Sequence, residues 1–79
     1  MTNYLVTYKG NATRFKKFRR EILADSEREA VELVYQIVLG DNYFPDNDGN
    51  IKDCEGDVIA ESDDDVIEYD GGYFLAEEI

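Results

Sequence analysis

The sequence predicts an α+β fold in which an antiparallel β-sheet carries one amphipathic helix packed on it, in the order β-β-α-β-β-β. Three observations predict it: an apolar period of three to four residues between positions 27 and 39, alternating segments on both sides of that stretch, and the adjacent glycines Gly71 and Gly72. The 79 residues form a single domain, 1–79, and so short a chain buries only roughly 60% of its unfolded surface. We therefore expect a thin core, with no linker and no internal repeat.

Residues 4–8 form the first expected strand. Tyr4, Val6 and Tyr8 share one face, in a stretch rich in the aromatic and β-branched residues that favour strands. Gly10 lies in the following segment, 9–12, whose composition is typical of a turn. A hairpin can therefore close there.

Residues 14–24 allow two interpretations. Phe15, Phe18 and Ile22 have helical spacing, but Phe18 and Ile22 also share one face of a strand. A strand places Arg20 on the apolar side, which favours the helix. A capping signal for a new helix follows directly, which favours the strand. We interpret the segment as a strand and keep the helix open as the alternative.

The helix expected from Glu27 has clear start and stop signals. Ser26 can accept a hydrogen bond from the backbone of Glu29, whose carboxylate can reach back to Ser26 in a capping box. Gly40 supplies the left-handed residue expected just past the end, and Pro45 prevents the helix from resuming. The apolar stripe expected to face the sheet consists of Ala30, Leu33, Val34, Ile37 and Val38.

The remaining chain reads as a polar loop followed by three strands. Residues 41–56 are rich in turn formers, and within them we expect Tyr43 and Phe44 to pack onto the core. The strands are expected at 57–61, 66–69 and 73–76, the last two joined by a tight turn at Asp70-Gly71-Gly72.

The residue types present argue against catalysis. The chain has no histidine, which is the commonest general base and the usual partner of a nucleophilic serine or cysteine. Catalytic carboxylates need a concave, partly desolvated site, and so short a chain builds little of a cleft. Cys54 lies between Asp53 and Glu55, where negative charge disfavours the thiolate, and we expect it to be inert and partly buried. We predict no enzyme activity, no catalytic residue and no cofactor.

One loop has part of the spacing of a calcium site. Asp46, Asp48 and Asn50 occupy positions 1, 3 and 5 of an EF-hand loop, and Asp57 occupies position 12. Position 6 requires glycine and here holds Ile51, and helices are not expected on both sides. We interpret the loop as a turn with solvated carboxylates and predict no metal site.

Charge is distributed unevenly along the chain. Seven of the eight basic residues lie before position 29, whereas sixteen of the nineteen acidic residues lie after position 28, where Lys52 is their only basic counterpart. A solvated, solubilising surface is the simpler interpretation of this acidity. The alternative is that carboxylates spaced along a sheet edge imitate DNA phosphates and bind a groove lined with Arg and Lys. The candidate contact residues are Glu61, Asp63, Asp64, Asp65, Glu68 and Asp70.

A second candidate surface is basic. It is formed by Arg14, Lys16, Lys17, Arg19 and Arg20. This segment can neutralise the acidic part of the same molecule, or it can contact RNA or an acidic partner with Phe15 and Phe18 as stacking groups. We favour the core for both aromatic residues, because a thin core needs them.

The order of elements resembles that of a known class of proteins. A first strand at Tyr4-Leu5-Val6, a basic second strand entering Ala24-Asp25-Ser26, and a helix that closes with Ile37-Val38-Leu39-Gly40 are similar to the small phage-encoded anti-CRISPR proteins that act on type I surveillance complexes. The resemblance covers about half of the chain and lies in architecture, size and acidity. It implies a phage protein that binds a multi-subunit, Arg- and Lys-rich nucleic-acid machine and blocks DNA recognition.

Two function classes therefore stand side by side. The first is an acidic inhibitor of a ribonucleoprotein defence complex in the host cytoplasm, which binds that complex and not DNA itself. The second is a regulatory or structural interaction module, such as an antitoxin or phage accessory protein, whose acidity serves solubility. The sequence has no apolar run of about 18 residues, so we expect no membrane association.

Overall fold

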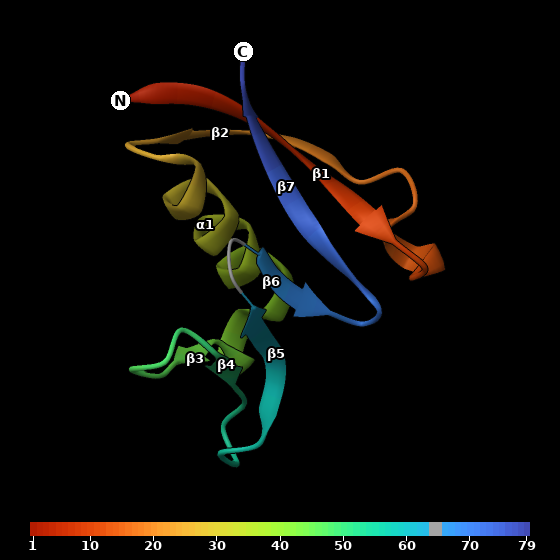
Figure 1. Cartoon of the computed structure of the whole chain (residues 1–79), viewed down its shortest axis with the longest axis vertical. Coiled ribbons are helices and arrows are strands. Elements are labelled where there is room, and N and C mark those ends of the chain that lie inside the picture. The colour runs from red at the N-terminus through yellow and green to blue at the C-terminus, as the bar shows by residue number, and fades with distance from the viewer. Residues whose placement is uncertain (64–65) are drawn as a thin grey trace.

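A computed structural model of the chain describes residues 1–63 and 66–79. Within this part, seven antiparallel strands form one curled sheet in the order β2-β1-β7-β6-β5-β4-β3, with a single α-helix (Figure 1). The elements are β1 (Thr2–Gly10), β2 (Arg19–Ala24), α1 (Glu27–Leu39), β3 (Phe44–Pro45), β4 (Ile51–Lys52), β5 (Val58–Asp63), β6 (Val66–Tyr69) and β7 (Gly72–Glu78). Two short 3₁₀ turns lie at Thr13–Phe15 and Gly40–Asn42. The α+β class is confirmed, with two more strands than expected.

The first and last strands lie side by side in the sheet (Figure 1). They pair antiparallel from Tyr4 opposite Glu78 to Gly10 opposite Gly72. The predicted alternation in β1 is correct, since Tyr4, Val6 and Tyr8 are all buried. Both termini consequently lie at the same end of the molecule.

The helix covers one face of the sheet, as expected, but its buried stripe differs from the predicted one. Ala30 and Val34 are buried, whereas Ile37 is 49% exposed and Tyr35 is fully buried. The buried face is therefore rotated toward Tyr35, whose hydroxyl donates a hydrogen bond to the backbone carbonyl of Ile67. A satisfied hydroxyl allows a large aromatic side chain to occupy the core in place of Ile37.

The predicted helix ends are correct, with one change of partner. Ser26 Oγ accepts a hydrogen bond from the Glu29 backbone at 3.1 Å, and the Glu29 carboxylate accepts from the Asp25 backbone at 3.0 Å. The carboxylate therefore reaches one residue further back than the capping box predicts. Gly40 closes the helix with φ of 58°, a conformation that favours glycine. No helix in the described ranges is long and apolar enough to cross a membrane.

The ambiguous segment 14–24 is strand only in its second half. A 3₁₀ turn carries Phe15, and the strand starts at Arg19. Both Phe15 and Phe18 pack into the core from the turn and the loop after it, which produces the helix-like spacing without a helix. Arg20 does share a face with Ile22, and its side chain remains exposed there.

The segment predicted to be loop contains β3 and β4, which are too short to show alternation in the sequence. They are bordered by two loops of the same design. Asp46 Oδ1 accepts backbone hydrogen bonds from the residues two and four positions later, and Asp53 Oδ1 does the same. Gly49 and Gly56 lie in corresponding places with φ of 89° and 88°. The two loops therefore repeat one local hydrogen-bond pattern seven residues apart.

Two further side chains in this region differ in their packing. Tyr43 is partly buried against the core, as predicted, but Phe44 is 50% exposed. Phe44 lies on β3, the edge strand, and pairs with Lys52. An edge strand with one neighbour leaves its side chains more open to solvent than a central strand does.

The predicted tight turn joins β6 and β7. Tyr69 pairs with Gly72, so the turn consists of Asp70 and Gly71, which have φ of 56° and 79°. Positive φ at both central residues is typical of a type I′ hairpin. Gly72 belongs to the strand, where an added Cβ would meet the Tyr8 hydroxyl.

Candidate binding surface

The strands β5 and β6 bring two of the predicted acidic residues face to face. Glu61 pairs directly with Glu68 in the antiparallel register, and both side chains are exposed. Their chain neighbours Ala60 and Ile67 are buried, so by alternation the two carboxylates point away from the core. Asp63 is on the same face of β5 and is also exposed. We call Glu61, Asp63 and Glu68 the acidic face.

The acidic face carries uncompensated negative charge. Directly opposed residues in an antiparallel pair have Cβ atoms about 5 Å apart, and like charges at that spacing repel each other. Among the described residues, the ion pairs are Arg14 with Asp70, Arg28 with Glu32, and Lys52 with Asp46. None of these pairs includes a member of the acidic face. The arrangement therefore favours a cation supplied from outside the molecule.

Open hollows lie on both sides of Glu68. One, of about 230 Å³, is lined by Glu61, Glu68 and Asp70 together with Val58 and Ile59. The other, of about 420 Å³, is lined by Glu68 and by Lys9, Gly10, Gly71, Gly72 and Tyr73. The first combines carboxylates with apolar surface, which matches the charged head and aliphatic stem of arginine or lysine.

The other predicted acidic residues have different surroundings. Asp64 and Asp65 lie outside the described residues. Asp70 lies in the β6–β7 turn and forms an ion pair with Arg14, whose Nη2 is 3.3 Å from Asp70 Oδ2. Asp70 is thus partly neutralised within the molecule, unlike Glu61 and Glu68.

Within the basic segment, Arg14 forms contacts to described parts of the molecule that the other four basic residues do not form. Arg14 Nη2 donates a hydrogen bond to the Tyr69 hydroxyl at 2.6 Å, and the guanidinium lies over Phe15 with 4.6 Å to the ring centroid. Together with the Asp70 ion pair, these contacts join the 3₁₀ turn to the β6–β7 hairpin. Phe15 is buried and packs against other core rings, as predicted.

The other four basic side chains of this segment form an exposed group on the loop before β2 and on β2 itself. Within residues 1–63 and 66–79 they form no ion pair. Since β2 is an edge strand, charged side chains there also hinder unwanted strand pairing. The group consists of Lys16, Lys17, Arg19 and Arg20.

The calcium-like loop is engaged internally. One carboxylate oxygen of Asp46 accepts backbone hydrogen bonds, and the other lies 3.7 Å from the Lys52 ammonium. Carboxylate oxygens of Asp53, Glu55 and Asp57 lie within 4.8 Å of one another in the second loop, a grouping that the sequence interpretation missed. Solvated loop carboxylates of this kind are common without a metal, and we assign no site to them.

Cys54 is exposed and not partly buried as expected. It lies at the outer end of the loop between β4 and β5, where the chain reverses away from the core. The apolar parts of the site, Val58 and Ile59, were also missed. The residues that lie next to them depend on which strands pair, and no local sequence pattern predicts that pairing.

Comparisons with known proteins found no match for this chain. No protein-family model matches the chain. No curated protein and no solved structure matches it either.

Proposed function

We propose that this protein binds an Arg- and Lys-lined groove of a nucleic-acid-binding complex through its acidic face and thereby blocks access of nucleic acid, without catalysing a reaction. The observation that carries the proposal is the direct opposition of Glu61 and Glu68 beside an open hollow that Val58 and Ile59 also line. The specific form that we favour is an anti-CRISPR protein, as the resemblance in architecture and acidity implies.

The energetics of this surface support binding of a basic partner. The free protein holds two opposed carboxylates whose repulsion raises its free energy. An arginine that enters between them removes this repulsion and can form a bidentate pair with a carboxylate. The stem of the arginine covers Val58 and Ile59, which adds apolar burial. DNA is repelled by the same charge, so the expected partner is the protein that holds DNA.

The test uses one double variant and one matched control. Glu61→Gln with Glu68→Gln removes two charges from the acidic face. Asp41→Asn with Glu55→Gln removes two exposed charges elsewhere and leaves the acidic face unchanged. Each protein is added to purified type I surveillance complexes, and binding of target DNA is measured. We expect inhibition by the natural protein and by the control, and loss of inhibition by the acidic-face variant.

A second measurement covers partners other than CRISPR complexes. The natural protein is immobilised on a resin and incubated with host lysate. Duplex DNA is then added as a competitor, and the proteins that it releases from the resin are identified. Release of DNA-binding proteins that the acidic-face variant fails to capture supports the groove mechanism. Equal capture by both variants contradicts it.

A small interaction module of the antitoxin or phage accessory type is the second candidate function. The observation that favours it is the exposed basic group at Lys16, Lys17, Arg19 and Arg20, which offers a contact surface independent of the acidic face. In that case a variant with these four residues changed to Gln loses its partner, and the acidic-face variant retains it.

A further inference from the structure

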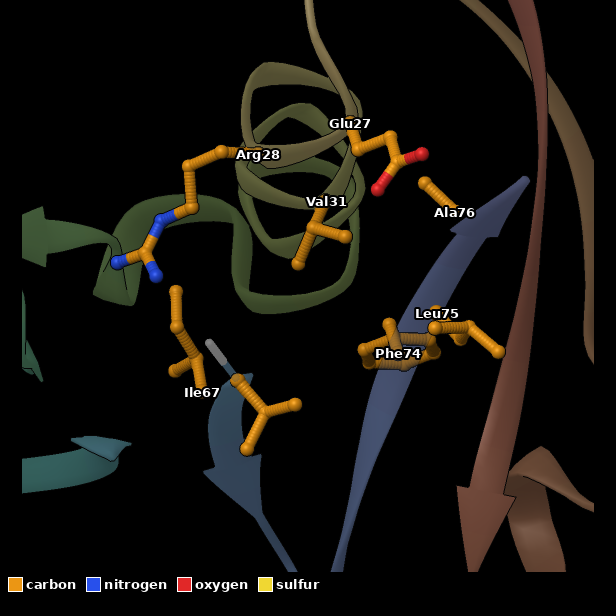
Figure 2. Close-up of a pocket in the computed structure, with 8 residues that line it drawn as sticks. Glu27, Arg28, Val31, Ile67, Phe74, Leu75 and Ala76 are labelled. Carbon is orange, nitrogen blue, oxygen red and sulfur yellow. The ribbon is translucent and has the colours of Figure 1, made fainter. Parts of the chain in front are cut away.

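The strands β6 and β7 separate soon after their turn. They pair only at Tyr69 with Gly72 and at Glu68 with Tyr73, although β7 continues to Glu78. A cleft of about 470 Å³ lies at this separation, between the two strands and the first turns of α1 (Figure 2). Its apolar lining consists of Val31, Val66, Ile67, Phe74, Leu75 and Ala76.

Tyr35 holds the two strands apart. By register, Ile67 and Phe74 are the next residues that would pair after Glu68 and Tyr73. The Tyr35 hydroxyl donates to the Ile67 carbonyl, and the Tyr35 ring packs edge-on against the Phe74 ring with 5.1 Å between the centroids. The phenol therefore occupies the place of a direct bond between these strands, and β6 diverges from β7 beyond it.

Beyond Tyr73, β7 has no strand partner on the side of the cleft within residues 1–63 and 66–79. The Ile79 backbone N–H donates to the Asn3 carbonyl at 3.1 Å, so odd-numbered residues of β7 direct their backbone groups toward β1. In an antiparallel strand the intervening residues direct theirs to the other side, which places the N–H and C=O groups of Ala76 and Glu78 on the β6 side. In the described part of the chain, no strand pairs with them.

Charge at the cleft indicates what can enter it. The Glu27 carboxylate lies beside Ala76 in Figure 2, and Glu78 is the last residue of β7, two positions after Ala76. The one cation that lines the cleft, Arg28, is held by Glu32 at 3.0 Å. The cleft thus combines apolar walls, unpaired backbone groups and carboxylates that lack a partner among the described residues.

We propose that this cleft binds an extended basic segment of a partner protein, which adds as a strand to β7. The backbone of the segment pairs with Ala76 and Glu78. One apolar side chain fills the space between Val31 and Phe74, and its basic neighbours meet Glu27 and Glu78. This is the strand-addition mode of peptide recognition. It uses a different surface from the acidic face and therefore goes beyond the proposed function.

The experiment uses a capped pentapeptide of alternating lysine and valine as the probe. Amide hydrogen exchange is followed by NMR, residue by residue, with and without the peptide. We expect exchange of the Ala76 amide to slow by about tenfold or more at saturation. The outward-facing amide of Glu21, on the basic edge strand β2, is expected to keep its rate. A glutamate–valine peptide and a lysine–valine peptide methylated at the valine amides are expected to have no effect.

A charge variant tests the assignment of the cleft. Glu27→Lys should weaken the lysine–valine peptide by about fivefold or more. The control Glu55→Lys has the same net charge and should bind as the natural protein does. The acidic-face variant, Glu61→Gln with Glu68→Gln, should also retain the peptide, which separates this proposal from the proposed function.

Three results overturn the proposal. Equal weakening by Glu55→Lys means that net charge alone attracts the peptide. Slow exchange of Ala76 in the free monomer means that the chain itself covers the edge of β7. A concentration-dependent dimer that protects Ala76 means that a second copy occupies the cleft.

Discussion

At the residue scale, Tyr35 has the most consequential surroundings. Its ring is fully buried among the side chains of Tyr69 and Phe74, and its hydroxyl bonds the Ile67 carbonyl. A buried carbonyl that loses a hydrogen-bond partner carries a desolvation penalty, which is why the single Tyr35 hydroxyl oxygen matters here.

We therefore predict that Tyr35→Phe lowers the free energy of unfolding by about 1–3 kcal/mol. This is a large part of the total for so small a domain, which is expected near the lower end of about 5–15 kcal/mol. Tyr4→Phe is the control, because the Tyr4 ring is also buried and its hydroxyl has no hydrogen bond within the described ranges. Urea unfolding of both variants measures the difference, and equal losses would contradict the assigned role of the Ile67 bond.

The free energy of unfolding at alkaline pH should also depend on Tyr35. Burial raises the pKa of Tyr35 above its ordinary value of 10.0, and burial together with the Glu32 charge raises the pKa of Tyr43. Below pH 10 both tyrosines are neutral in both states, so they add no pH dependence. Above it the unfolded chain loses their protons first, and the free energy of unfolding falls by up to about 1.4 kcal/mol per pH unit for each tyrosine.

The measurement is urea unfolding between about pH 8 and pH 12, where the slope arises. Tyr35→Phe should make the decline shallower, because it removes one of the two contributing groups. Tyr43→Phe should do so as well. Identical slopes in all three proteins would show that other groups cause the decline.

At the scale of elements, the orientation of α1 is the feature to test. Val34 is fully buried and Ile37 is half-exposed, three residues further along the same helix. Val34→Asp buries an unpaired charge and should unfold the protein, at a cost of several kcal/mol. Ile37→Asp should leave it folded. Circular dichroism of the two variants provides the comparison, and a folded Val34→Asp variant would contradict the orientation of the helix.

The sequence predicted the elements that have a long enough pattern. Strong caps at Ser26 and Gly40 and a steady period identified α1, and alternation identified β1, β5, β6 and β7. The position of Tyr35 was missed because a tyrosine counts as apolar only where its hydroxyl finds a partner, and Ile67 lies on another element. The two-residue strands β3 and β4 are too short for any period.

The binding surfaces were less predictable than the elements. Glu61 and Glu68 were both candidates, but their direct opposition depends on the register of β5 with β6. The ion pair between Arg14 and Asp70 joins the basic and acidic segments. Its two residues are far apart in the chain, so no local sequence pattern predicts it. The cleft beside β7 depends on where two strands separate, and that point is determined by a side chain from the helix.

At the scale of the whole molecule, net charge should control the rate of the association that we propose. The net charge of −11 attracts a basic partner over a distance that salt controls, because the Debye length falls from about 14 Å at about 50 mM salt to about 4 Å at about 500 mM. We predict that association of the natural protein with its partner slows steeply over this range. Glu61→Gln with Glu68→Gln should reduce the salt slope more than Asp41→Asn with Glu55→Gln does. Stopped-flow kinetics measures the slopes, and equal slopes in the two variants would assign steering to net charge alone.

The paired loops that begin at Asp46 and Asp53 have a consequence for how this chain can change in length. The two loops begin seven residues apart, each with an aspartate, and the seven-residue unit made of the first loop and β4 (46–52) reverses the chain once. Inserting one extra unit would reverse the direction in which β3 runs. The start of β3 would then lie away from Leu39, the end of α1, although the chain enters β3 from there. Two extra units would restore the direction and leave a wider sheet on the same helix. Insertions here should therefore be tolerated in even numbers of units and disruptive in odd numbers, so the loops impose a parity on the growth of this fold.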